Sequence, residues 1–454
     1  MKSVKWLAPV ALLWSFAASS NTFEGLYELG KKNNLLLKAQ NALQESEKQQ
    51  ENVAFANLLP RAALLGNWNY QQQKSSVDSD SYLDVLTDRR NQADGFGYEL
   101  SVTQPLFNMQ AYYNYERGQG VAKRAGIVKT QAKLQFIQDY SEAYLTLVTD
   151  WQRLDNIEKT LEAYKAQRDV IVKQYEIGLA RPSDLQQARA SLASLEAQSI
   201  SVKSSLAIGF RRLELLLQSP VTGVNSMVAN VDQLIAIEPS MQHYMFKFNQ
   251  NVDYQIAFSE VNIADKTLKA SETASWPTVA ASLRYSDNHF DNTFDFQPGN
   301  TIHQDGLSFA VQVTVPLYAG SADTYSKRAS AYSYQSAKLQ KQFVEHQVKQ
   351  SIRSVYLNLK AGIALVQSRQ ASVLASTQAL ENAKTEYSSG IGQYLNVRNS
   401  QDRLFEQTNQ LITERNTFVA NYFLLARLTG EEPDVTIEKM KSIFMGEEIG
   451  HESE

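Results

Sequence analysis

The alternation of apolar and polar side chains is clearest between residues 307 and 317. Every second position is apolar, and the positions between them are small or polar. The apolar positions are Leu307, Phe309, Val311, Val313, Val315 and Leu317, and the others include Ser308, Ala310, Gln312 and Thr314. A period of two predicts a β-strand with one apolar and one polar face.

The same period recurs in residues 62–70, 94–107 and 279–285. The chain is therefore expected to form four strands, arranged as two pairs. Within each pair, the strands are separated by a polar segment rich in Ser, Asp, Asn and Gln, over residues 71–93 and 287–304. These two segments are predicted to be loops.

A helical segment precedes each strand pair. Residues 33–58 and 251–275 are largely polar, contain many alanines and lack proline. Such a composition favours a helix. Pro60 and Pro277 then end the two helices, because the residue before a proline is biased away from helical geometry.

Much longer helical segments follow the strands. Residues 110–176 and 321–388 contain no proline. At ~1.5 Å per residue, a helix of this length reaches on the order of 100 Å. Such a length lies far outside the ordinary range of globular proteins.

A glycine-containing turn and one more helix complete each series. In the first of these helices, apolar or small residues recur at alternating steps of three and four: Leu185, Ala188, Leu192, Leu195, Ser199, Val202, Leu206, Gly209, Leu213 and Leu216. The second helix keeps one such position per heptad, at Val397, Leu404, Leu411, Phe418 and Leu425. Heptads of this kind predict helices that pack lengthwise against neighbours.

The second half of the chain repeats the first with a shift of roughly 210 residues. Residues 94–107 match 305–318, with glycine, threonine and a Pro-Leu-aromatic ending in register. The turn beginning at Tyr175 matches the turn beginning at Tyr387, and both read Tyr-x-x-Gly-apolar. The chain is thus predicted to be an α+β protein with an internal twofold repeat.

This repeat gives a domain organisation for the whole chain. Residues 21–218 and 244–430 are predicted to be the two structural repeats, and residues 219–243, which carry two prolines and a glycine, a connector. Residues 431–454 are polar and end in acidic side chains, so we expect a poorly ordered tail. Residues 1–20 combine two lysines, an apolar stretch and a small-residue ending, as in a cleavable secretory signal.

Composition restricts the partners and the chemistry. The formal net charge is −4, and removal of Lys2 and Lys5 with the signal makes it more negative, which argues against nucleic acid as a partner. There is no cysteine, and the five histidines show no ligand spacing. Because no nucleophile elbow or phosphate loop is present either, we expect no catalysis and no cofactor.

The predicted secretory signal and the amphipathic strands together favour an outer-membrane β-barrel, since no apolar run is long enough for a membrane-spanning helix. A soluble half-buried sheet would show the same alternation, but fits the signal and polar segments less well. Four strands cannot close a barrel, so two copies would give eight strands and three would give twelve. The apolar face would meet lipid, and six aromatic residues are candidates for interfacial girdles: Trp68, Tyr70, Tyr98, Phe107, Tyr285 and Tyr318.

Taken in this order, the motifs resemble those of the TolC-like outer-membrane efflux proteins over essentially the whole chain after the signal. The resemblance rests on Asn33, Ala39 and Leu59-Pro60, the strands ending at Phe107 and Tyr318, and the turns at 175–192 and 387–404. It implies a homotrimer with a twelve-stranded barrel in the outer membrane that continues into a periplasmic helical barrel. It also implies a periplasmic adaptor and an inner-membrane transporter as partners, in efflux or type I secretion.

The resemblance also assigns roles to the two turns. Their tips, which would contact the adaptor, match Ile177, Gly178, Leu179, Ser389, Gly390 and Ile391. The pore constriction of relatives carries an arginine and aspartates, which correspond here to Gly392, Asn396 and Asn399, while Asp184 keeps a carboxylate in the first copy. Arg181, Tyr394 and Arg398 are candidates for other links there. Alternatively, these positions form a solvated helix start.

A coiled-coil scaffold or adhesin of the cell envelope is the competing interpretation. It explains the heptads but leaves the duplicated amphipathic strand pairs without a role. The sequence does not identify the exported cargo or the class of pump.

Overall fold

The structure is a computed structural model that describes residues 21–75, 89–228, 240–294 and 297–450. The predicted signal, residues 1–20, lies outside the described residues. The chain divides into two compact units. One comprises residues 44–125 and 257–341, and the other residues up to 43, 126–256 and 342–454.

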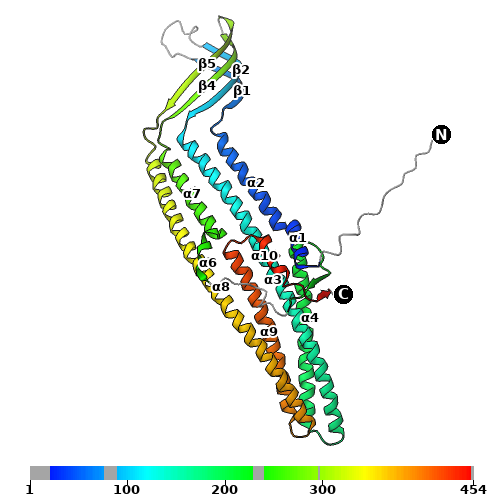
Figure 1. The fold of residues 1–454 in the computed structure, drawn as a ribbon. Helices are drawn as coiled ribbons and strands as arrows, with labels where there is room; N and C mark the ends of the chain where they lie inside the picture. Colours follow the sequence, from blue (N-terminus) through cyan, green and yellow to red (C-terminus); the bar gives the residue numbers. More distant parts are fainter. Residues whose placement is uncertain (1–20, 76–88, 229–239, 295–296, 451–454) are drawn as a thin grey trace, which may run out of the picture. The chain divides into compact units, whose positions relative to one another are not determined.

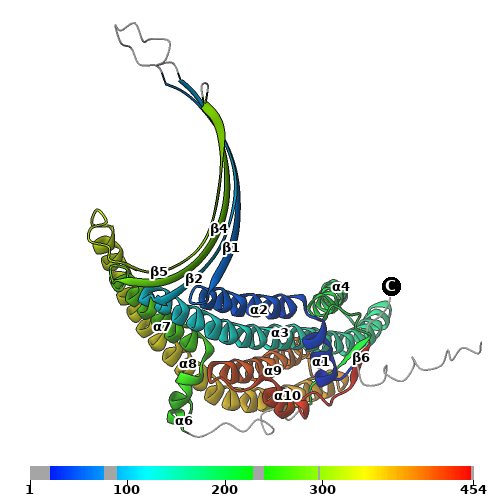
Figure 2. The same ribbon diagram turned by 90° about the horizontal axis from the view of Figure 1, so that it is seen from above.

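The first of these units contains the four long strands (Figure 1). They are β1 (Arg61–Ser75), β2 (Arg89–Phe107), β4 (Thr278–Phe294) and β5 (Gln297–Thr314). They form one antiparallel sheet in the order β1-β2-β4-β5, drawn as a single curved layer in Figure 2. Because β2 belongs to the first repeat and β4 to the second, the central pair of strands joins the two copies.

The register confirms that one face of this sheet is apolar. Leu100 lies opposite Tyr285, and Leu283 lies opposite Phe309. Leu100, Leu283 and Phe309 stay exposed in the single chain; Phe309, for example, is 70% exposed. The opposite face is polar, and there Arg284 Nε lies 3.0 Å from Glu99 Oε1.

The predicted loops at 71–93 and 287–304 were too long. β1 continues to Ser75, β2 begins at Arg89, and β4 and β5 extend to Phe294 and from Gln297. The outer ends of these strands have polar residues at successive positions, so their sequence shows no apolar alternation. Backbone hydrogen bonds between the paired strands nevertheless extend the two hairpins. At the other end, β5 stops at Thr314 rather than at Leu317, because Pro316 has no amide to donate and Pro277 ends the partner strand.

Four helical segments in the same unit lead into or out of the strands. The segments of α2 (Leu35–Ala56), α3 (Met109–Glu176), α7 (Val252–Glu272) and α8 (Ala322–Ser388) that belong to this unit lie side by side. Ion pairs and hydrogen bonds join neighbours, as between Lys266 of α7 and Glu116 of α3 (Nζ–Oε2, 2.6 Å) and between Ser271 and Ser330 of α7 and α8 (2.8 Å).

The second unit consists of two helical hairpins with shorter elements packed on them. α3 pairs with α4 (Pro182–Leu217), and α8 pairs with α9 (Tyr394–Leu428). The predicted heptad side of α4 is buried at Leu185, Ala188, Leu192, Leu195, Ser199, Gly209 and Leu213, and that of α9 at Val397, Leu411, Phe418 and Leu425. None of the helices within the described part of the chain is long and apolar enough to cross a membrane.

The main core of this unit contains a cluster of aromatic rings. Tyr140 and Tyr144 of α3 are fully buried and contact Phe23 of α1 (Phe23–Asn33). The Tyr140 hydroxyl donates to the Phe23 carbonyl (2.6 Å), and the Tyr144 hydroxyl donates to the carbonyl of Asn225 (2.8 Å). Burial raises the pKa of both phenols, so they remain donors.

The predicted disordered tail is wrong for residues 431–450. They form α10 (Pro433–Lys441) and β6 (Glu448–Gly450), and β6 pairs with β3 (Gly223–Asn225) of the predicted connector. The segment was predicted to be disordered because it is polar overall. Its widely spaced apolar side chains nevertheless lie in the core: Ile437, Met440, Ile443, Phe444 and Ile449. The connector also contains the start of α6 (Met241–Met245), which leads into a short 3-10 helix (Phe246–Gln250).

We expect Phe444→Ala to release this C-terminal segment. The Phe444 ring stacks on Phe23 at 4.2 Å between ring centroids, and loss of a buried phenylalanine costs about 3–5 kcal/mol. Hydrogen exchange should accelerate over residues 433–450. Met445→Ala is the control, because Met445 is 61% exposed and should change exchange little. Equal exchange in both variants would contradict the packing described here.

Candidate functional site: the two helix-turn tips

The two turns have the same backbone geometry. Gly178 and Gly390 both adopt φ of +77°, a left-handed conformation that glycine adopts without steric cost. The amide after each glycine, that of Leu179 or Ile391, donates to the carbonyl five residues earlier, at 2.7 and 3.1 Å respectively. These bonds are those of a Schellman cap, which explains why the Tyr-x-x-Gly-apolar pattern ends both long helices.

Each tip presents apolar side chains to solvent. Ile177 is 69% exposed, Leu179 77% and Ile391 85%. Ser389 instead bonds to its own helix, since its hydroxyl donates to the Thr385 carbonyl (2.8 Å). Nothing lies within 4 Å of where a Cβ would stand at either left-handed glycine. The six tip residues are therefore uncharged and open to solvent.

The structure places the predicted constriction residues at and just after the two turns. Asp184 lies in the first turn of α4, where its charge helps to raise the pKa of Tyr387, after burial as the larger cause. Asn396 and Asn399 are exposed, three residues apart at the start of α9. At Gly392, a Cβ would lie 3.0 Å from the Tyr387 backbone nitrogen, so this turn is not shaped for the arginine of the resemblance.

Hydrogen bonds connect the two hairpins just behind the tips. The Tyr387 hydroxyl of α8 donates to Gln174 Oε1 of α3 (2.6 Å). Further along, the Tyr164 hydroxyl of α3 donates to Asp402 of α9, and Arg398 Nε lies 3.4 Å from the same carboxylate. The two tyrosine hydrogen bonds each tie one copy of the repeat to the other, whereas the Arg398–Asp402 pair lies within α9.

Sequence reasoning found only part of this set of links. It named Arg398 and Tyr394, and Tyr394 is buried against Ile171 and Leu185 between the hairpins. It missed Tyr164 and Asp402, although a tyrosine on an apolar stripe of a long helix is a signal for a hydrogen-bonded core position. Arg181, also proposed as a link, is the exposed residue that precedes α4.

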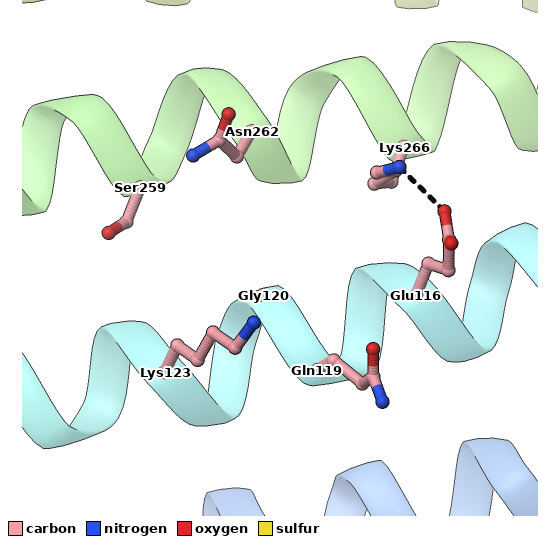
Figure 3. Close-up of a pocket in the computed structure, with 7 residues that line it drawn as sticks. All are labelled: Glu116, Gln119, Gly120, Lys123, Ser259, Asn262 and Lys266. Carbon is pink, nitrogen blue, oxygen red and sulfur yellow. Dashed lines mark hydrogen bonds and ion pairs between the residues drawn. The ribbon is translucent and has the colours of Figure 1, made fainter.

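Polar hollows lie between helices, and Figure 3 shows one between α3 and α7. It has a volume of about 300 Å³, and its lining includes Glu116, Lys123 and Lys266. The hydrogen bond from Lys266 lowers the pKa of Glu116. Because Glu116 and Lys266 already neutralise each other, the hollow provides no acid–base pair poised for catalysis. Within the described residues, the group suited to a metal ion is Asp287, His289 and His303 on the β4–β5 hairpin.

Comparison with known proteins places these features in one class. The family described as outer membrane efflux protein matches residues 26–218. TolC of Salmonella enteritidis is 21% identical over 92% of this chain and 84% of its own length, and BepC of Brucella suis is 25% identical over 97% and 94%. The protease secretion protein PrtF of Dickeya chrysanthemi is 24% identical over 80% and 78%.

The fold is also that of a solved outer-membrane protein. VceC of Vibrio cholerae superposes with a TM-score of 0.75 at 17% identity, covering 90% of this chain and 96% of VceC. The duplicated strand pairs and glycine-capped hairpins thus place the chain in a class whose relatives are named as outer-membrane efflux and secretion proteins. Within this class, the chain is similar over most of its length to TolC-like outer-membrane efflux proteins, and it is located in the Gram-negative outer membrane.

We expect Tyr387→Phe to loosen the tips. The change removes the hydrogen bond to Gln174, worth about 1 kcal/mol, without creating a cavity. Hydrogen exchange should accelerate at residues 174–180 and 386–392. The matched control is Tyr175→Phe at the equivalent position of the other repeat, where the side chain is 43% exposed. If both variants exchange alike, the bond does not hold the hairpins together.

Proposed function

We propose that three copies of this chain form an exit channel, with a twelve-stranded barrel in the outer membrane continuing into a periplasmic helical barrel. The observation that carries the proposal is the sheet. Its apolar face is exposed in the single chain, and its edge strands β1 and β5 have no further strand partner among the described residues. In lipid, unpaired backbone groups each cost several kcal/mol, so the edges must pair with other copies.

The two faces of the sheet suit this arrangement. The apolar face would contact lipid, and the polar face, with Glu99 and Arg284, would line a wet lumen. Tyr98 and Tyr285 lie on the apolar face with ring centroids 6.3 Å apart, and Trp68 lies on the same face of β1. Aromatic residues at such positions form the girdles at membrane–water interfaces.

The helical hairpins would form the periplasmic part, with their tips contacting an adaptor that links the channel to an inner-membrane transporter. The exposed Ile177, Leu179 and Ile391 supply an apolar contact surface at the tips. Asp184, Gly392, Asn396 and Asn399 would then lie near the narrowest point. The names of BepC and PrtF, an efflux protein and a protease secretion protein, support efflux or type I secretion as the use of the channel.

A coiled-coil scaffold is the second candidate. It accounts for the packed heptads of α4 and α9 but gives the exposed apolar sheet no partner. The two candidates differ in a single property, since a channel conducts ions across a lipid bilayer and a scaffold does not.

Conductance in a planar bilayer tests the channel and its constriction together. We expect discrete openings of the detergent-purified trimer, and only weak block by divalent cations, because Asn396 and Asn399 are neutral amides. Asn396→Asp with Asn399→Asp should strengthen that block at least tenfold, since a ring of carboxylates attracts cations. Gln378→Glu adds one negative charge per chain, half of the charge added in the double variant, at an exposed position of α8 and should leave the block unchanged.

Absence of conductance from intact trimers, both in the wild type and after Tyr387→Phe, would contradict the channel. Strong divalent block of the wild type would contradict the amide constriction alone.

The tips are tested with substitutions at the left-handed glycines. We expect Gly178→Lys or Gly390→Lys to weaken adaptor binding about tenfold, equivalent to ~1.4 kcal/mol, and to reduce efflux, because a charge enters an apolar contact. Trimers should remain intact, since the new side chain points into open space. Asparagine at the same positions is the control, because it tolerates positive φ and is neutral. Normal adaptor binding by the lysine variants would count against the assigned tips.

A further inference from the structure

Two histidines and an aspartate converge on one face of the β4–β5 hairpin. His289 and His303 are directly opposite each other across the two strands, and Asp287 is directly opposite Asp305. All four side chains project from the same face of the sheet, because they occupy alternate positions of paired strands. The two imidazole rings lie 4.2 Å apart between centroids.

The distances between the donor atoms fit one small cation. Nδ1 of His289 and Nδ1 of His303 each lie 3.4 Å from the same oxygen, Asp287 Oδ1. In a tetrahedral zinc site, with bonds of roughly 2.1 Å, neighbouring ligand atoms are roughly 3.4 Å apart. All three donor atoms lie within 4.8 Å of one another. An ion could therefore contact all three with little movement of the strands.

One oxygen of the Asp287 carboxylate accepts a hydrogen bond, and the other has no hydrogen-bond donor. Its side chain is only 14% exposed, and Oδ1 is buried without a hydrogen-bond partner. The other oxygen, Oδ2, accepts a hydrogen bond from the Tyr98 hydroxyl of β2 (2.9 Å). A buried carboxylate oxygen without a donor is unfavourable unless a cation satisfies it.

Asp305 completes the surroundings of His303. Its Oδ1 lies 3.8 Å from Nε2 of His303, the ring nitrogen that does not face Asp287. This distance is longer than a hydrogen bond, but a small rotation of either side chain would let the carboxylate accept from Nε2 and leave Nδ1 to bind a metal. Histidines that bind metals commonly have such a partner.

We propose that Asp287, His289 and His303 bind a divalent transition-metal ion of the zinc type. Two neutral imidazoles and one carboxylate are ligands that zinc accepts, and solvent can occupy the fourth position because both histidines are about half exposed. The ion would tie β4 to β5 just beyond Tyr285 and Leu307, the last apolar pair between these two strands on that face. This proposal does not depend on the channel function.

The test uses the full-length trimer in detergent, without a polyhistidine tag and after treatment with a chelator. Titration with Zn²⁺ in a calorimeter should show one ion per chain. Co²⁺ should give the visible absorption of a tetrahedral complex. His289→Ala, His303→Ala and Asp287→Asn should each weaken binding at least tenfold.

Two controls separate this site from general histidine binding. Gln304→Ala changes a residue between His303 and Asp305 that projects from the other face, and His346→Ala removes a histidine of α8. Both should bind Zn²⁺ like the wild type. In the wild type alone, Zn²⁺ should also slow hydrogen exchange across residues 285–305.

Trimer size and circular dichroism must match the wild type in every variant. No saturable binding by the wild type, or equal affinity in His289→Ala, His303→Ala and the controls, would overturn the proposal.

Discussion

The backbone groups at the two edges of the sheet set the main constraint on this protein. β1 and β5 each have one strand partner within the described chain, so one side of each strand offers unpaired amides and carbonyls. An apolar face that includes Leu64, Leu100, Leu283 and Phe309 makes the sheet suited to lipid, where such groups cannot be left without hydrogen bonds. A single chain therefore cannot satisfy its own sheet in a membrane, and the proposed assembly follows from this.

Duplication explains how the chain supplies matching edges and matching hairpins. Each repeat contributes two strands and one long helical hairpin, and β2 and β4 join the repeats in the sheet. In the helical unit, the corresponding joins are side-chain contacts, such as Tyr164 with Asp402 and Tyr387 with Gln174. The elements that break the repeat, α1, α10 and the β3–β6 pair, pack around Phe23 and Phe444.

Periodicity predicted the elements whose sides differ in polarity. The long helices, the heptad sides of α4 and α9 and the apolar strand face all have a regular pattern, and the bounds of the long helices fall close to the predicted ones. The polar ends of the strand hairpins were not predicted, because backbone pairing holds them. Residues 433–450 were not predicted to be ordered, because a few dispersed apolar contacts hold them. The pairing of His289 with His303 was also hidden, since it depends on the register of two strands within a segment predicted to be a loop.

The chemistry behind the tips indicates how a closed state would be held in the proposed trimer. Two carboxylates about 4 Å apart repel by about 4 kcal/mol near a protein surface, so a ring of aspartates resists close approach unless cations neutralise it. Asn396 and Asn399 remove that repulsion. Burial raises the pKa of Tyr164 and of Tyr387, so both remain hydrogen-bond donors to Asp402 and Gln174 at neutral pH. In the proposed trimer, closure would then rest on neutral donors within each chain, and opening would require a partner that separates the hairpins at their tips.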